Sequence, residues 1–154
     1  VLSDFQVSVP ELGTIKATVT RIVFLTSNNT REMSDALKRR CLHLHITFPE
    51  PALERRILER RVPGLSETLN RELVAFVQAV RQLDLKKLPS VSETIDWAKT
   101  LLLLNAEHLS LDLVRDTLNV FLKFEQDIAT ANEQMGNLLQ QARKDAEVSH
   151  ASHT

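Results

Sequence analysis

The hydrophobic pattern of the chain changes its period at about residue 50. Before this point apolar residues alternate with polar ones or run together, as in β-strands, and after it they recur every three or four residues, as in helices. Two prolines in "FPEP" (48–51) separate the patterns, because proline interrupts both strand ladders and helix interiors. We expect an α/β fragment over residues 1–50, an all-α helical bundle over 51–147 and a flexible tail over 148–154.

The first half predicts a β-hairpin followed by a strand–helix–strand unit. Alternating apolar residues flank the turn signal "PELG", which predicts a hairpin over 5–19. The apolar run "RIVFL" (21–25) is typical of a strand buried on both faces of a parallel sheet. A short helix over 35–40, capped by Ser34, precedes the strictly alternating "CLHLHITF" (41–48), which predicts a second strand of this sheet.

The second half predicts four or five amphipathic helices. Pro51 suits a first helical turn, Ser66 and Ser110 can cap later helices, and Ser90 with Glu93 fits a capping box. The last helix is expected to run to about Ala146, and Trp97 is expected to pack inside the bundle. The apolar stripes that predict the core consist of Leu53, Ile57, Leu58, Leu69, Leu73, Phe76, Val77, Val80, Ile95, Ala98, Leu101, Leu102, Leu111, Val114, Leu118 and Leu122.

Net charge, cysteine content and the length of apolar runs limit the partners and the location that we expect for this chain. The 19 basic and 20 acidic residues give a net charge of −1, which does not call for nucleic acid or an anionic membrane as a partner. A single cysteine, Cys41, allows no intrachain disulfide and suggests a reducing compartment. The apolar run Leu101–Leu104 is far shorter than the ~20 residues of a membrane span, and no signal peptide opens the chain. We therefore expect a cytoplasmic protein that does not enter a membrane.

Two polar groups lie where an α/β sheet binds ligands. Asn28 follows the predicted strand 21–25, and its amide could donate to a phosphate oxygen and orient a water, or it could be an ordinary loop asparagine. Arg39 and Arg40 end the predicted short helix. They could complement the helix dipole, a contribution of about 0.3–1 kcal/mol, or present a guanidinium to the phosphate of a neighbouring subunit. The spacing alone leaves both interpretations open.

Other polar clusters favour structural roles. Cys41, His43 and His45 share one face of a predicted strand, but no further ligand completes a usual set, so we assign no metal site. Arginines and glutamates interleave through "LERRILERR" (53–61), where Arg55 and Glu59 are four residues apart. This pattern predicts a solvated helix face with modest pairing. The three glycines are isolated, so the chain contains no P-loop.

The stretch "IVFLTSNNTREMSDALKRRCLHLHITFPEP" resembles the second part of an AAA+ ATPase core, most closely that of MoxR-type ATPases, and "PSVSETIDWAKTL" is similar to their helical lid. The resemblance covers about residues 1–125. It implies the sensor-1 role for Asn28 and the arginine-finger role for Arg40, with Arg39 as the neighbouring candidate. It also implies that the hairpin 5–19 is the insertion that faces the pore or the substrate of a ring.

The chain departs from the family in two ways. The Walker A and Walker B stretches are absent and would lie upstream of Val1, so this chain alone is expected neither to bind nor to hydrolyse ATP. The lid arginine called sensor 2 has no match, because Ser92 or Glu93 occupies its neighbourhood. Ser92 is therefore the lid residue that the resemblance places nearest to the nucleotide.

The resemblance implies a function for the longer protein. This chain would be the C-terminal portion of an ATPase that couples ATP hydrolysis in a ring to chaperone-like remodelling or cofactor maturation of partner proteins. ATP and Mg²⁺ would be its cofactors. Its partners would be neighbouring subunits, in a hexamer for instance, and a client protein, with metalloenzymes among the candidates.

Two alternatives remain. The first is a clamp-loader-like ATPase acting on DNA, because "RRC" also resembles the serine-arginine-cysteine motif of that group, although the near-neutral charge argues mildly against it. The second is a non-enzymatic helical module that only binds protein.

Overall fold

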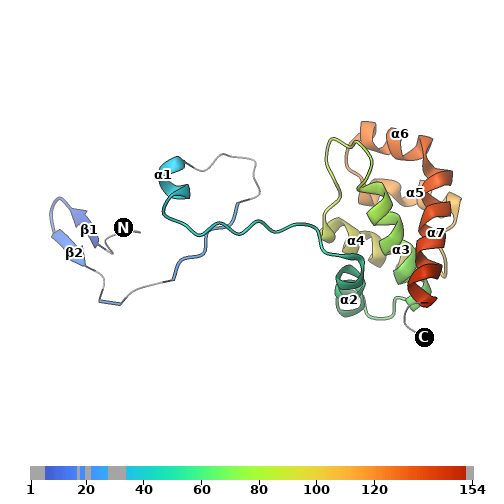
Figure 1. The fold of residues 1–154 in the computed structure, drawn as a ribbon, viewed down its shortest axis with the longest axis horizontal. Helices are drawn as coiled ribbons and strands as arrows, with labels where there is room; N and C mark the ends of the chain where they lie inside the picture. The colour runs from blue at the N-terminus through green and yellow to red at the C-terminus, as the bar shows by residue number, and fades with distance from the viewer. Residues whose placement is uncertain (1–5, 17, 20–21, 28–33, 152–154) are drawn as a thin grey trace. The chain divides into compact units, whose positions relative to one another are not determined.

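The structure, a computed structural model, describes residues 6–16, 18–19, 22–27 and 34–151 (Figure 1). It divides into two units, Val1–Ile46 and Thr47–Thr154, which are described one at a time. Short strands occur in the first unit, and the second is helical. None of the helices in the described ranges combines the length and the apolar character that crossing a bilayer requires.

The first unit contains the predicted hairpin. Strand β1 (Gln6–Val9) pairs antiparallel with β2 (Gly13–Lys16). The turn closes through a 3.1 Å bond from the Leu12 amide to the Val9 carbonyl, and Gly13 takes a φ of 73°, a backbone region that favours glycine. The hairpin is thus confirmed at the turn that "PELG" predicted. Its strands are shorter than the expected range 5–19, of which Phe5 and Ala17 lie outside the described residues.

The two predicted sheet strands after the hairpin do not form. Residues 22–27 and 42–50 adopt neither strand nor helix, and helix α1 (Asp35–Lys38) is shorter than the expected 35–40. Ser34 does occupy the N-cap of α1, but its side chain makes no capping bond. The physical reason is that a strand needs a neighbouring strand for its backbone hydrogen bonds. The described part of this unit offers no partner beyond the hairpin.

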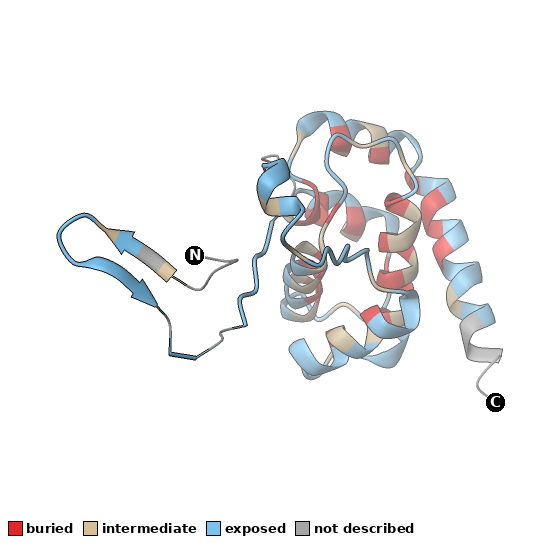
Figure 2. Ribbon diagram, turned by 60° about the vertical axis from the view of Figure 1, so that its left-hand side comes forward, coloured by how far each residue is buried: buried red, intermediate tan, exposed pale blue. Residues whose placement is uncertain are grey.

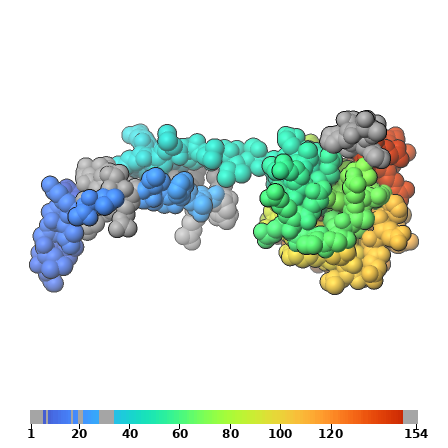
Figure 3. Space-filling view, turned by 90° about the horizontal axis from the view of Figure 1, so that it is seen from below, coloured from blue at the N-terminus to red at the C-terminus, as the bar shows by residue number. Residues whose placement is uncertain are grey.

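Without a sheet, the apolar residues of these segments remain exposed. Phe24 is 89% exposed and Leu44 is 82% exposed, and Ile22, Leu42 and Ile46 are similarly open to solvent. Figure 2 shows the described residues of the first unit almost entirely in the exposed colour, and the space-filling view shows them as a thin path of chain (Figure 3). Monomeric soluble proteins rarely expose apolar side chains to this extent.

The second unit is a bundle of six helices in its described part. Serine side chains accept backbone N–H groups at three predicted starts: Ser66 from Leu69 at 3.1 Å, Ser90 from Glu93 at 3.4 Å, and Ser110 from Leu113 at 3.2 Å. Pro51 begins the first of them, also as predicted. The helices are α2 (Pro51–Arg61), α3 (Glu67–Val80), α4 (Val91–Leu103), α5 (Leu111–Phe121), α6 (Glu125–Glu133) and α7 (Met135–Ala151).

The second unit has one helix more than the four or five expected, and its last helix passes the expected end near Ala146. The chain forms α6, leaves helical geometry at Gln134 with φ −106° and ψ 5°, and starts again as α7. This break lets α7 turn back along α3, the helix with which it has its most extensive contacts. Helix α7 also continues to Ala151, through residues 148–151 that the sequence pattern had assigned to a flexible tail.

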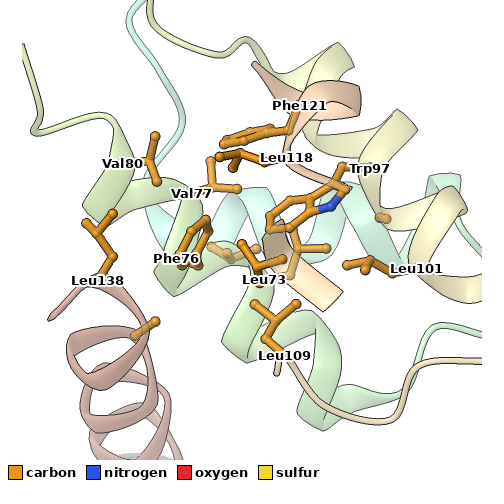
Figure 4. Packing of buried hydrophobic residues seen from close by; sticks show 14 of the residues in the cluster. Leu73, Phe76, Val77, Val80, Trp97, Leu101, Leu109, Leu118, Phe121 and Leu138 are labelled. Atoms are coloured by element: carbon orange, nitrogen blue, oxygen red, sulfur yellow. The ribbon is translucent and has the colours of Figure 1, made fainter. Parts of the chain in front are cut away.

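Trp97 occupies the centre of the bundle, as predicted (Figure 4). Its ring stacks on Phe121 at a centroid distance of 4.9 Å and meets Phe76 at 5.5 Å in a tilted arrangement. Its indole N–H donates to Thr117 Oγ1 at 2.8 Å, which satisfies the one polar atom of the side chain. The stripe of α3 is buried throughout, whereas Leu53 and Leu111, near helix starts, are exposed.

Candidate functional site

The two arginines predicted to reach a neighbouring nucleotide close helix α1. Arg39 is its C-cap residue, and the Arg40 amide donates to the Leu37 carbonyl at 3.0 Å. Both side chains are exposed, and neither forms an ion pair with any residue in the described part of the chain. The end of α1 therefore presents two exposed, charged guanidinium groups that remain available to a partner. Asn28, the proposed sensor, lies outside the described residues, so its role stays a prediction.

The start of α4 holds the candidate lid residues. Ser92 is its second residue and is exposed, whereas Glu93 is its third and is bound on two sides. The Glu93 carboxylate accepts the Ser90 amide at 2.6 Å and the Lys87 ammonium at 2.8 Å. Burial raises the pKa of this carboxyl, but the bonds from Lys87 and Ser90 outweigh it, so the pKa falls below the ordinary value of 4.5. The Glu93 carboxylate thus caps the start of α4, and the exposed Ser92 side chain lies beside it.

Arg39 and Arg40 are neighbours in the first unit, and Ser92 belongs to the second unit. No group of three or more His, Cys, Asp or Glu side chains in the described ranges is arranged to hold a metal ion. Cys41 is partly exposed and His43 and His45 are exposed, since the strand that would have aligned them is not formed.

Of the charged residues of α2 that were predicted to be solvated, some are exposed and one is buried. Arg56, Arg60 and Arg61 are exposed as expected, but the expected ion pair between Arg55 and Glu59 is not formed. Glu54, which the pattern had grouped with them, is fully buried. Its position explains the difference, because Glu54 lies four residues before Leu58 and therefore shares the buried side of α2.

Glu54 is the centre of a buried polar network that the sequence analysis missed. Arg81 binds it with both terminal nitrogens, Nη1 to Oε2 at 2.7 Å and Nη2 to Oε1 at 2.8 Å. Gln78 Nε2 donates to Oε2 at 2.9 Å, and Thr94 Oγ1 donates to Oε1 at 3.3 Å. The carboxylate thus receives hydrogen bonds from α3, α4 and Arg81, as a buried charge requires.

Arg81 also contacts the segments that precede α2 and α4. Its Nε donates to the Pro89 carbonyl at 2.9 Å, just before α4. Its guanidinium carbon lies 4.4 Å from the centre of the Phe48 ring, just before α2. A signal was present in the sequence, because Arg81 lies four residues after Val77 and continues the buried stripe of α3 with a charge. Opposite charges on two buried faces predict a pair.

Two further buried carboxylates hold loops. Asp127 accepts the Lys86 and Lys87 amides at 2.8 and 3.2 Å. Glu72 accepts the Leu109 amide at 2.7 Å and faces His108 Nδ1 at 3.1 Å. Each acid is paired with groups of its own chain, so the buried acids of the bundle serve as structural acceptors and leave no unpaired acid–base set.

Comparisons with protein-family models, with curated proteins and with solved structures find no match to this chain. The likeness to MoxR-type ATPases therefore rests on the sequence stretches quoted above, and the roles of Asn28, Arg40 and Ser92 are predictions.

Proposed function

We propose that this chain is the C-terminal portion of a MoxR-type AAA+ ATPase, which couples ATP hydrolysis in a ring to remodelling or cofactor maturation of a client protein. The longer protein would use ATP and Mg²⁺. Asn28 would orient the attacking water in its own subunit, and Arg40 would reach the ATP of the next subunit, with Arg39 beside it. The helical unit would be the lid, with Ser92 at the start of α4 on its nucleotide side.

The observation that carries this proposal is the exposed apolar surface of two segments patterned as sheet strands. Residues 22–25 form a continuous apolar run, and the side chains of Leu42, Leu44 and Ile46 alternate with polar ones. Each buried apolar side chain contributes about 1.5–3 kcal/mol relative to an exposed one, so this surface strongly favours partner strands. A nucleotide-binding α/β core that contains the Walker motifs would supply such strands on both sides.

The state of the arginines agrees with the proposed finger. An arginine supplied across a subunit boundary can accelerate phosphoryl transfer by about 10³–10⁵, because it stabilises charge that develops on the phosphates. Such a residue must be free of ion pairs within its own chain. Arg40 meets this condition among the described residues and follows directly after α1.

The test is the ATP turnover of the longer protein that this proposal requires. Arg40→Ala should retain ATP binding and lower turnover by about 10³ or more, as expected for loss of a finger in trans. Arg60→Ala is the matched control, since it removes an equally exposed arginine of α2 and should leave turnover unchanged. Turnover of Arg40→Ala equal to that of the unaltered protein would contradict the finger role.

The isolated chain gives a second test. Calorimetry with ATP and Mg²⁺ should detect no binding, because no P-loop is present to cradle the phosphates. Tight binding would place the nucleotide site within residues 1–154 and contradict the proposed division of the site. A longer protein that neither binds nor hydrolyses ATP would instead favour the non-enzymatic interaction module.

A further inference from the structure

The segment Phe48–Glu50, which leads into α2, is held in place although it forms neither helix nor strand. The Phe48 ring lies against the Arg81 guanidinium, 4.4 Å from Cζ to the ring centre. The Pro49 carbonyl accepts a 3.2 Å hydrogen bond from Gln78 Nε2. Both holding side chains come from the end of α3, and all of these residues belong to the second unit.

Burial alone does not hold the Phe48 ring. Phe48 is 43% exposed, and its neighbours Thr47 and Pro49 are exposed and half-buried, respectively. The ring is not inserted in the core, and it lies against the face of Arg81 in a cation–π contact.

Arg81 is a rigid platform for this contact. It forms two bonds to the Glu54 carboxylate and one to the Pro89 carbonyl, so all three of its nitrogens are engaged. Its guanidinium plane cannot turn away from Phe48 without breaking a buried ion pair. The prolines at 49 and 51 add stiffness, since each restricts its own φ and keeps the preceding residue extended.

We propose that Arg81 and Gln78 are positioning residues that clamp Phe48 and Pro49 to the end of α3 and so fix the direction in which the chain leaves the helical unit. Bending between the two units is then confined to residues before Phe48. A reorientation of the helical unit is transmitted through the clamp to residues 42–47 instead of being absorbed next to α2. This role stands whether or not the protein is an ATPase.

The experiment is ¹⁵N relaxation of the 154-residue chain, read at the Phe48 and Glu50 amides, since Pro49 and Pro51 have none. In the unaltered chain these amides should have order parameters like those of α2, about 0.85, and Ile46 should be below about 0.6. In Phe48→Ala/Gln78→Ala both amides should fall below about 0.6 while α2 stays at about 0.85. This variant keeps the Glu54–Arg81 pair, and fluorescence of Trp97 verifies that the bundle is folded.

Two matched variants separate the clamp from a general loosening of the fold. Gln82→Ala removes an exposed glutamine one turn after Gln78 and should change neither amide. Phe48→Tyr keeps an aromatic face over Arg81 and should preserve both order parameters. The proposal is overturned if the amides are already mobile in the unaltered chain, or if they stay rigid in Phe48→Ala/Gln78→Ala.

Discussion

Two phenylalanines on either side of residue 47 experience opposite environments. Phe24 is 89% exposed, whereas Phe76 is fully buried between the helices of the bundle. The difference comes from how each backbone satisfies its hydrogen bonds. A helix does so within its own segment, so that amphipathic helices need only pack together, whereas a strand depends on neighbours that can be far away in sequence. The helical unit therefore completes its core from its own residues, whereas the part of the first unit that the structure describes forms no core.

The largest expected effect comes from truncating Phe76, for which truncation of Phe24 is the comparison. Phe76→Ala should lower the free energy of unfolding of the helical unit by about 3–5 kcal/mol, because it leaves a cavity beside Trp97. Phe24→Ala should change it by less than about 0.5 kcal/mol, since no buried contact is lost. Urea denaturation followed through Trp97, the single tryptophan, measures both. A cost for Phe24→Ala that approaches that of Phe76→Ala would mean that the first unit has a core of its own.

The second test concerns charges on one helix. Glu54→Gln should cost about 3 kcal/mol, because the Arg81 guanidinium stays buried without its counter-ion while the amide keeps the shape of the side chain. Glu59→Gln, at an exposed position of the same α2, should stay within about 0.5 kcal/mol. The same urea titration separates them. Equal effects would show that the Glu54–Arg81 pair does not help to hold α2, α3 and α4 together.

These contrasts explain which features the sequence could predict. Helix starts at Pro51, Ser66, Ser90 and Ser110 were predicted correctly because capping is decided within four residues. Trp97 was assigned to the core correctly, and it lies four residues before the buried Leu101 on the same face of α4. Local rules were sufficient wherever the stabilising partner is near in sequence.

The features that were missed depend on distant partners. Glu54 and Arg81 are 27 residues apart, and a pattern confined to α2 grouped Glu54 with the solvated charges. The expected strands 21–25 and 41–48 have the right composition, but a strand exists only when its neighbours do. The break at Gln134 lies two residues before the isolated Gly136, a signal that the sequence analysis did not use, and it lets α7 pack on α3. For the candidate site, the sequence correctly predicted that Arg39 and Arg40 lie at the end of a short helix. The role of Asn28 stays a prediction.

A third, smaller test compares two serine N-caps. Ser66→Ala should cost about 1 kcal/mol, since its hydroxyl accepts the Leu69 amide at the start of α3. Ser34→Ala should cost close to nothing, because Ser34 occupies the N-cap of α1 without a side-chain bond. Urea midpoints report on the first, and circular dichroism in the helix region reports on both. A loss of helix in Ser34→Ala would show that α1 is capped in solution and that the first unit is better ordered than its exposed residues suggest.

The smallest expected effect is a pH dependence that only the helical unit should show. The pKa of Glu93 is lowered in the folded state, so its charge stabilises the fold fully above the unfolded pKa of about 4.5, and this contribution is lost as the pH falls through the folded pKa. Glu93→Gln keeps an acceptor for the Ser90 amide but loses the attraction to Lys87, which is itself half exposed, so the expected cost at pH 7 is below about 1 kcal/mol.

The free energies of unfolding of the unaltered chain and of Glu93→Gln should therefore differ by a constant amount above about pH 5 and converge below pH 4.5. Glu11→Gln, in the hairpin turn, removes an exposed carboxylate that has no hydrogen-bond partner among the described residues, and it should leave the profile unchanged. A difference for Glu93→Gln that persists at low pH would mean that the substitution perturbs the cap itself rather than its charge. A pH-dependent effect of Glu11→Gln would mean that the first unit contributes to the folding transition, which the comparison of the two units denies.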